Sequence, residues 1–538
     1  MSTSRLRWST ATGAGLLLAF AACTLVLDRS PVQCNSDSDC AAFGTHPFCR
    51  SNVCVPSGLG PAQCFYGTPQ SDDQFLNQCG TAECTSFDSC AHKICDGNPV
   101  DAGLVAVPRP DAGAPSSANE AGAPDGGADG GGIEAGTVDA GTLSDLPKCF
   151  DPNEGRSQVV YITGSSNFPP LLAQLAPLLA EPAAGGYTPI YRITSSCDGV
   201  RSMLSDKESD HRLRDPAPGP TANYATYFTS SGAAVMCTLG PDGAQIDVGE
   251  SDIFSSTCSG FAEPTGDVEH VLGPILAMAF VVPGSSTQRS ITAEAAFSVF
   301  GRGGKNASGE AVSPWDTPSY YYVRNANTGT QQMIGRAINV PADKFWGIDR
   351  GTAKRVAETL PILDPSLAEK AIGIISIDFY DLNRVGVKAL AFTAFGQSCA
   401  YLPDSTPFSF DKRNVRDGHY PIWGPLHFFA TASNGVPTSA AALAFLNVVS
   451  GNVVTGDVPN KLLDAYIGAS MVPPCAMSVQ RNAELGPMTA YSPRGQCGCY
   501  FEKKATGKAP SGCAVCETSE DCSDPKRPFC SHGFCEVQ

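Results

Sequence analysis

The chain has 538 residues and a formal net charge of −17. This length is too great for one compact domain, and the charge excludes a nucleic-acid binder that works through a basic face. Net negative charge also gives no long-range attraction for an anion, so any anion site must depend on local hydrogen-bond donors.

Residues 1–23 have the features of an export signal. Arg5 and Arg7 form a basic region, and residues 13–22 form a short apolar segment that leads to Cys23. The segment resembles a bacterial lipoprotein signal with Cys23 as the lipidated residue, which predicts a membrane-anchored lipoprotein in the periplasm or on the cell surface. An ordinary cleaved signal peptide is the alternative. A membrane span is not expected, because the apolar run is shorter than the roughly 20 residues that cross a bilayer.

Cysteine-rich modules are predicted at both ends, in residues 24–95 and 476–538. The chain has 23 cysteines, and setting Cys23 aside leaves an even number, which indicates disulfides in an exported chain. The spacing from Cys34 is C-x5-C-x8-C-x4-C, and the spacing from Cys516 is C-x5-C-x7-C-x4-C. Both copies also have Asp before the second cysteine and Pro-Phe before the third. We interpret them as two copies of one small disulfide-stabilised module.

Other cysteine roles stay open at this point. The pairs Cys513-x2-Cys516 and Cys497-x-Cys499 also suit zinc, although disulfides are favoured outside the cytoplasm. Further along the chain, the sequence leaves open whether Cys197 and Cys258 pair with each other or whether one of them pairs with Cys237.

Residues 96–148 are predicted to be a disordered linker. Asp-Ala-Gly recurs at Asp101, Asp111 and Asp139, among Gly, Pro, Ser and Ala, and this composition cannot form a core. A flexible chain of this length spans roughly 40 Å on average, so it would hold the following domain away from a membrane.

Residues 150–475 are predicted to be a globular α/β domain. Strands are expected at 159–163, 189–193 and 246–249, and a leucine-rich helical face follows the first strand. This alternation indicates a largely parallel sheet. Residues 205–244 are interpreted as a polar insertion.

Two long β-prone segments, 271–283 and 420–430, bracket a second α/β region at 284–419. The helix expected at 439–450 then returns to the first region. We therefore predict two lobes joined by two crossovers, an arrangement in which ligands usually lie in the cleft. The expected bounds are about 157–271 and 422–470 for lobe 1, and about 272–421 for lobe 2.

Four loops follow predicted strands and combine hydroxyl, amide and backbone donors with one carboxylate. They are 164–169 (GSSNFP), 195–200 (SSCDGV), 247–252 (DVGESD) and 324–330 (RNANTGT). Arg324 ends a tyrosine-rich strand, and Thr328 to Thr330 open a helix. A helix N-terminus with a nearby guanidinium suits an oxyanion.

Taken in order, these loops and the segment 420–424 (YPIWG) resemble the high-affinity phosphate-binding protein of bacterial ABC importers. The family motifs are G-x-G-x-T-F-P, G-S-S-G-G-V, D-F-G-A-S-D, R-x-x-G-S-G-T and Y-P-I-x-G. The resemblance covers about residues 157–470. It implies a two-lobed, periplasmic-binding-protein-like α/β fold, here flanked by the small disulfide-rich terminal modules.

The resemblance also implies the ligand-binding residues. Arg324 would supply charge, and Asp252 would accept the proton of HPO4, which sulfate lacks at neutral pH. The implied donors are the backbone N–H groups of Phe168, Gly329 and Thr330 and the side chains of Asn167, Ser196, Thr328 and Thr330. Asn167 stands in the threonine position of the first motif. Asp198 departs from the second motif, and it is either a helix cap or a charge that repels a dianion.

We therefore expect an extracytoplasmic, lipid-anchored solute-binding protein that captures inorganic phosphate or a related oxyanion for ABC import. An ABC permease is the expected partner, and no cofactor, metal, nucleic acid or enzymatic activity is expected. The chain has no H-E-x-x-H and no G-x-S-x-G motif. The alternative is a surface interaction or sensor protein with a degenerate binding core and partner-binding cysteine-rich modules.

Overall fold

The computed structural model of the chain describes residues 37–40, 48–50, 53–55, 64–80, 82–89, 91–93, 146–214, 223–453 and 458–537. Cys23 and nearly all of the predicted linker lie outside these residues, so the lipid anchor and the linker stay predictions. The chain divides into two units, Met1–Gly80 and Thr81–Gln538. The division falls inside the segment 24–95 that we predicted to be one module.

The first unit is described only in its residues 37–40, 48–50, 53–55 and 64–80. Its described elements are η1 (Asp37–Cys40), the antiparallel hairpin β1 (Phe48–Arg50) and β2 (Val53–Val55), and α2 (Asp72–Leu76). A disulfide joins Cys64 to Cys79.

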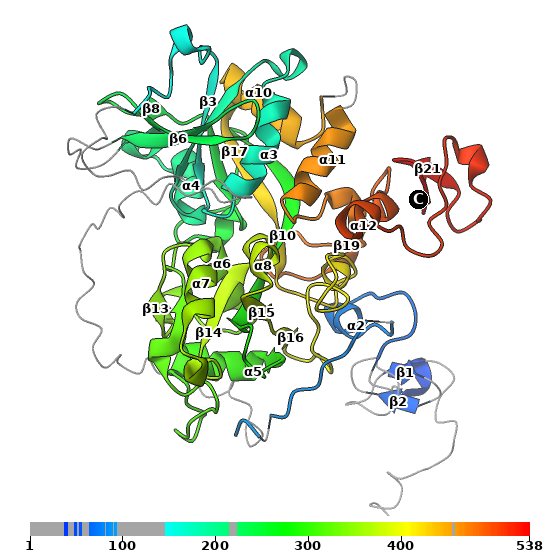
Figure 1. The fold of residues 1–538 in the computed structure, drawn as a ribbon. Coiled ribbons are helices and arrows are strands. Elements are labelled where there is room, and N and C mark those ends of the chain that lie inside the picture. The colour runs from blue at the N-terminus through cyan, green and yellow to red at the C-terminus, as the bar shows by residue number, and fades with distance from the viewer. Residues whose placement is uncertain are drawn as a thin grey trace, which may run out of the picture. The chain divides into compact units, whose positions relative to one another are not determined.

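The second unit is built on one twelve-stranded mixed sheet (Figure 1). Ten of its strands follow the order β13-β12-β14-β10-β17-β9-β3-β4-β6-β7. The other two lie beside this order, where β15 pairs with β10 and β18 pairs with β17. Its strands are β3 (Val159–Gly164), β4 (Thr188–Ile193), β6 (Tyr224–Phe228), β7 (Ala234–Thr238), β9 (Val248–Ser251), β10 (Val268–Pro283), β12 (Tyr321–Val323), β13 (Ile348–Asp349), β14 (Ile372–Ser376), β15 (Val387–Ala389), β17 (Trp423–Ser433) and β18 (Val436–Pro437).

The helices of this unit are α3 (Pro169–Leu179), α4 (Ser196–Leu204), α5 (Ala293–Ala296), α6 (Gly329–Ala337), α7 (Ala353–Thr359), α8 (Ile377–Asn383), α9 (Arg413–Arg416), α10 (Ala440–Val449), α11 (Val458–Gly468) and α12 (Gly498–Thr506). Four further strand pairs lie outside the main sheet: β5 (Arg212–Leu213) with β8 (Ala244–Gln245), β11 (Ser290–Thr292) with β16 (Ala391–Thr393), β19 (Val479–Gln480) with β20 (Thr489–Ala490), and β21 (Phe529–Ser531) with β22 (Phe534–Glu536).

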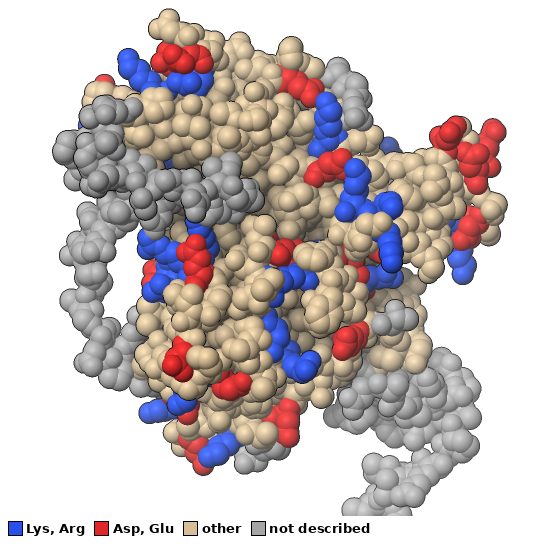
Figure 2. All heavy atoms as spheres, in the orientation of Figure 1, with Lys and Arg blue, Asp and Glu red and all other residues tan. Residues whose placement is uncertain are grey.

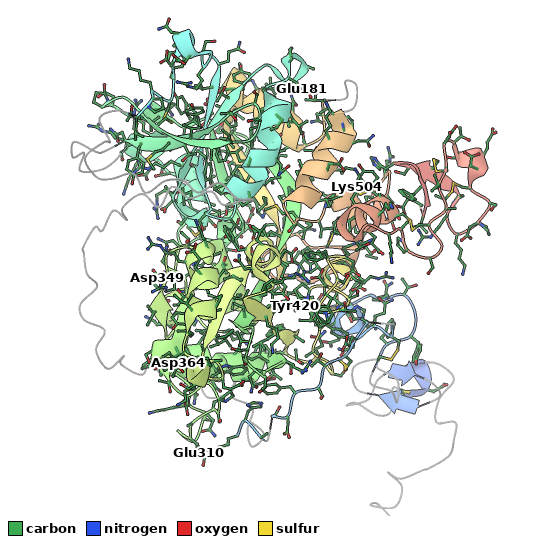
Figure 3. The ribbon with its side chains drawn as sticks, in the orientation of Figure 1. Glu181, Glu310, Asp349, Asp364, Tyr420 and Lys504 are labelled. Atoms are coloured by element: carbon green, nitrogen blue, oxygen red, sulfur yellow. A yellow bond between two sulfur atoms is a disulfide. The ribbon has the colours of Figure 1, made fainter. Side chains whose placement is uncertain are left out.

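Strands β10 and β17 connect two lobes. The first part of β10 pairs with β17, which also pairs with β9, whereas Met278–Val281 pair with β14. Lobe 1 therefore contains β9, β3, β4, β6 and β7, and lobe 2 contains β14, β12 and β13. The Tyr420 hydroxyl, labelled in Figure 3, donates to the Met278 carbonyl at 2.6 Å and joins the two connections. The prediction of an α/β fold with two lobes and two crossovers is confirmed.

The parallel core of each lobe follows the predicted strands. In lobe 1, β3 is parallel to β4 and to β9, and in lobe 2, β12 is parallel to β13 and to β14. Helix α3 begins at Pro169, where a missing N–H costs nothing, and it buries its leucine face. The carboxyl ends of parallel strands meet at one sheet edge, which is where the predicted loops lie.

The interpretation of residues 205–244 as a polar insertion is wrong for part of that segment. The β6–β7 hairpin extends the main sheet antiparallel to β4, and the disulfide Cys149–Cys237 fixes β7 to the residues before β3. Only two positions of β6 and one of β7 are buried, so the strands lack the alternating burial that gives a clear period-2 pattern.

The C-terminal module is held by disulfides. The pairs are Cys475–Cys497, Cys499–Cys513, Cys516–Cys530 and Cys522–Cys535. The sulfurs considered for zinc are therefore in disulfides and cannot act as thiolate ligands. In the β21–β22 hairpin Cys530 lies opposite Cys535, and in the β1–β2 hairpin Cys49 lies opposite Cys54. The shared register supports the interpretation of the two motifs as copies of one module.

The surface carries both signs of charge. Figure 2 shows acidic and basic side chains interspersed over the face in view. Among the residues that the structure describes, no helix has the length and apolar character needed to span a bilayer.

Candidate functional site

The predicted loops meet where the two lobes touch. The Gly329 N–H at the start of α6 in lobe 2 donates to the Ser196 hydroxyl of lobe 1 at 2.9 Å. Beside it, the Cys197 N–H donates to the Asn327 carbonyl at 3.2 Å. The helix starts of α4 and α6 therefore face each other across the lobe boundary.

Asp252 is the central acceptor of this contact, and its side chain is fully buried. Its Oδ2 accepts hydrogen bonds from Ser165 Oγ at 2.5 Å, Asn167 Nδ2 at 2.9 Å and Ser196 Oγ at 3.3 Å. No N–H or O–H group of the described residues donates to its Oδ1. Burial raises the pKa of Asp252, whereas these hydrogen bonds and the positive charge of Arg324 oppose that rise.

Arg324 is the buried cation of the site, 2% exposed. Its Nε donates to the Gly351 carbonyl at 3.1 Å, and its Nη2 donates across the lobe boundary to Ser166 Oγ at 2.9 Å. Its Nη1 has no hydrogen-bond acceptor among the described residues. Burial lowers the pKa of Arg324 to about 10, against the effect of Asp252, of Asp349 and of Asp378, so the guanidinium stays charged at neutral pH. Asp349, at the end of β13, is labelled in Figure 3.

The remaining predicted residues of lobe 2 differ in where they point. The Thr330 hydroxyl accepts from Asn167 Nδ2 at 3.3 Å, so it belongs to the interlobe contact. The Thr328 hydroxyl instead donates to the Asn325 carbonyl at 2.8 Å, inside its own turn.

Phe168 has a different place from the one that the resemblance implied. Its N–H donates to the Ser165 carbonyl at 3.3 Å, and its fully buried ring packs against Tyr191, Phe428 and Phe445. The ring anchors the loop in the core of lobe 1. The structure therefore brings six of the eight predicted ligand-binding residues into one network: Asn167, Ser196, Asp252, Arg324, Gly329 and Thr330.

Asp198 is held away from the interlobe contact. Ser195, the N-cap of α4, accepts from the Asp198 N–H at 3.2 Å and donates to its Oδ2 at 2.6 Å, and Arg201 forms an ion pair with the same side chain. The interpretation of Asp198 as a helix cap is wrong, because Ser195 is the N-cap and Asp198 lies in the first turn of α4, where its charge is compensated locally. The preceding residue, Cys197, is in a disulfide with Cys258.

Three buried acids near the site were not predicted: Glu250, Asp378 and Glu484. Glu250 lies on β9, two residues before Asp252, and could have been noticed within the third loop. Asp378 lies in the first turn of α8, and burial raises its pKa to about 7. Glu484 comes from the C-terminal extension, and its Oε2 accepts from the Phe254 N–H at 3.2 Å. No local sequence signal places Glu484 here.

Replacing Glu484 with glutamine is expected to stabilise the protein at pH 8 and to have little effect at pH 4. Burial, against the effect of Arg481, raises the pKa of Glu484 from 4.5 to about 7. The folded state therefore resists ionisation, and the resulting loss of stability begins near pH 4.5 and is complete above about pH 7. At about 1.4 kcal/mol per pKa unit, the gain at pH 8 is at most about 3 kcal/mol.

Denaturant unfolding of both proteins at the two pH values measures this difference. The control is Glu208→Gln, at an exposed position of lobe 1, which should change stability equally little at both. An equal effect of Glu484→Gln at pH 4 and pH 8 would contradict the argument.

Comparison with known proteins does not assign the chain to a family. No protein-family model matches the chain, and no curated protein matches it. Similar solved structures include an ABC-type phosphate transport receptor from Vibrio cholerae, at 12% identity and a TM-score of 0.36, with 59% of this chain and 100% of that chain covered. They also include PstS from Borrelia burgdorferi, at 13% identity and a TM-score of 0.32, covering 59% and 99%.

An OxyR C206 mutant from Corynebacterium glutamicum is similar as well, at 9% identity and a TM-score of 0.31, covering 61% of this chain and 69% of that one. TM-scores this low do not assign a function to the chain, so its function must be argued from the residues of the site.

Proposed function

We propose that the chain is a solute-binding protein that captures a tetrahedral oxyanion, HPO4 in the first place, between its two lobes. One observation carries the proposal. A buried acceptor without a donor, Asp252 Oδ1, and a buried donor without an acceptor, Arg324 Nη1, come from opposite lobes and join one network. Unpaired buried polar groups are costly, and a ligand with both an O–H group and anionic oxygens would satisfy both.

Ligand entry would exchange interlobe hydrogen bonds for bonds to the anion. The Gly329 N–H now donates to Ser196 Oγ, and Asn167 Nδ2 donates to Thr330 Oγ1. All four groups can donate to an oxyanion placed between the lobes, since the two N–H groups are donors and the two hydroxyls can rotate from accepting to donating. The dipoles of α4 and α6 favour a negative charge at that point.

Selectivity would come from Asp252. A carboxylate buried beside an anion is tolerable only if a proton lies between them. HPO4 brings that proton, and sulfate does not at neutral pH. Sulfate would therefore leave Asp252 Oδ1 facing an anionic oxygen, which penalises it.

Titration calorimetry with phosphate and with sulfate tests this function. The wild type should bind phosphate in preference to sulfate, and Asp252→Asn should lose most of that preference because an amide can donate to either anion. The matched control is Asp198→Asn, because the Asp198 carboxylate is held by Ser195 and Arg201 outside the network. Equal affinity of the wild type for both anions, or no heat with either, would refute the proposal.

Delivery to an ABC permease and anchoring through a lipid on Cys23 are part of the same proposal. Mass spectrometry of the membrane-extracted protein would detect the lipid on the N-terminal cysteine, and a Cys23→Ser variant should be released from the membrane. A wild-type protein that begins before Cys23 or carries no lipid would argue against the anchor.

A second candidate function is a surface interaction or sensor protein whose core no longer takes a ligand. The observation that favours it is that three of the predicted ligand donors already have protein acceptors: the Thr328 hydroxyl, the Phe168 N–H and the Gly329 N–H are all bonded. Absence of phosphate binding, together with unchanged stability of Arg324→Lys in phosphate buffer, would support this candidate instead.

A further inference from the structure

Glu250 is a second carboxyl beside the proposed anion acceptor. Residues two apart on a strand point to the same face, so Glu250 and Asp252 share one side of the end of β9. Ser165 contacts both, since its N–H donates to Glu250 Oε2 at 2.8 Å and its hydroxyl donates to Asp252 Oδ2 at 2.5 Å. Both carboxyl groups are fully buried.

The surroundings of Glu250 are built around its carboxyl group. The Tyr191 hydroxyl shares its one proton between the Ser165 carbonyl at 2.6 Å and Glu250 Oε2 at 3.1 Å, and Glu250 Oε1 has no donor among the described residues. Gly164 leaves room for the group, because a Cβ at that position would lie 2.6 Å from Oε2. In the D-F-G-A-S-D motif this position holds alanine, which has no group to ionise.

We propose that Glu250 and Asp252 form an acid pair that holds one proton, and that the oxyanion binds to the singly protonated pair. This inference rests on the proposed function and adds a specificity-determining residue to it. The proton stays mainly on Glu250, while Asp252 keeps the negative charge and its Oδ1 remains free to accept the proton of the ligand. Ionisation of Glu250 would place two negative charges beside an incoming dianion and weaken binding.

The groups around the two carboxyls explain why the proton stays on Glu250 and not on Asp252. Asp252 has three hydrogen-bond donors and the Arg324 guanidinium, whereas Glu250 has two donors and no cation. Burial, then the charge of Asp252, raises the pKa of Glu250 well above its usual range. Burial likewise raises the pKa of Tyr191 well above its usual value, so Tyr191 stays a neutral donor.

The negative charge of Asp252 also acts on two acids of other elements. They are Asp378 on α8 and Glu484 in the C-terminal extension, and burial raises the pKa of each to about 7. Because they also titrate near neutral pH, a pH dependence of binding by itself would not identify Glu250. Only a comparison between variants can do so.

The test measures the dissociation constant of phosphate from pH 5.5 to pH 9 for the wild type, Glu250→Gln and Glu484→Gln. Above the pKa of the pair, wild-type affinity should fall by up to about tenfold per pH unit, as linkage to one proton requires. Glu250→Gln should lose this extra dependence, and what remains is the ionisation of phosphate itself and of Asp378 and Glu484. Glu484→Gln, which removes a second buried carboxyl outside the pair, should keep it.

A second readout needs no ligand. Infrared difference spectra between neutral and alkaline pH should show the carbonyl bands of protonated carboxyl groups and, beside those of Asp378 and Glu484, one band that is absent from Glu250→Gln. Phosphate binding with the same pH dependence in the wild type and Glu250→Gln, or the same infrared bands in both, would overturn the acid pair alone. No phosphate binding by the wild type would refute the proposed function, and with it the link between the acid pair and anion binding, even if the infrared band is present.

Discussion

Replacing Arg324 with alanine is expected to weaken phosphate binding by about 30- to 4,000-fold. The guanidinium is buried, is charged at neutral pH and has one N–H group free for a ligand. Removal of a charged partner from a buried hydrogen-bonded site costs about 2–5 kcal/mol, which corresponds to a loss of about 30- to 4,000-fold in affinity. The substitution also removes the cation that offsets Asp252, so the negative charge left behind repels the anion.

Calorimetry with phosphate measures the loss, and two variants make the result specific. Arg336→Ala removes an exposed arginine from α6 in the same lobe and should leave the dissociation constant unchanged. Arg324→Lys keeps the charge but loses the planar donor fork, so it should bind more weakly than the wild type and more tightly than the alanine variant. Phosphate binding by Arg324→Ala at wild-type affinity would remove Arg324 from the site.

The sequence was sufficient for the main architecture because the strands of the two parallel cores are short apolar runs that end at recognisable loops. Arg324 and Asp252 could be predicted to meet because both follow strands whose carboxyl ends lie at one sheet edge. The β6–β7 hairpin was missed because Tyr224–Phe228 and Ala234–Thr238 show no regular alternation of buried positions and are held in the sheet by β4 and the Cys149–Cys237 disulfide. Such long-range pairing leaves little local signal.

Hydrogen-bond partners within the site were less predictable than the site itself. A threonine hydroxyl before a helix can turn to its own loop or to a ligand, and Thr328 donates to Asn325. Glu484 is distant in sequence from Phe254 and reaches it only because the C-terminal extension folds back onto the domain. Cysteine spacing revealed the repeated module, but the pairs Cys516–Cys530 and Cys522–Cys535 needed three-dimensional geometry.

Replacing Gly329 with alanine is expected to weaken phosphate binding by about 5- to 150-fold while leaving the hydrogen-bond donors in place. A Cβ at Gly329 would lie 2.6 Å from Asp252 Cβ and 2.7 Å from Ser196 Oγ, so the lobes could not approach as closely as they do here. Overpacking of this kind costs about 1–3 kcal/mol, which sets the expected range. Alanine is a good helix former at the start of α6, and the N–H group is kept, so the effect is steric.

The readout that separates this steric effect from a folding defect is the distance between the lobes. A fluorophore pair with one label on each lobe should report a wider separation in Gly329→Ala at saturating phosphate than in the wild type. Gly266→Ala is the matched control, because a Cβ there meets no atom within 4 Å. Wild-type affinity and wild-type separation in Gly329→Ala would mean that the anion is not bound where α6 meets Asp252. If Gly329→Ala has the wild-type distance between the lobes but a weaker affinity for phosphate, the lobes close normally. The role of Gly329 would then lie in the backbone conformation that it gives to the ligand site.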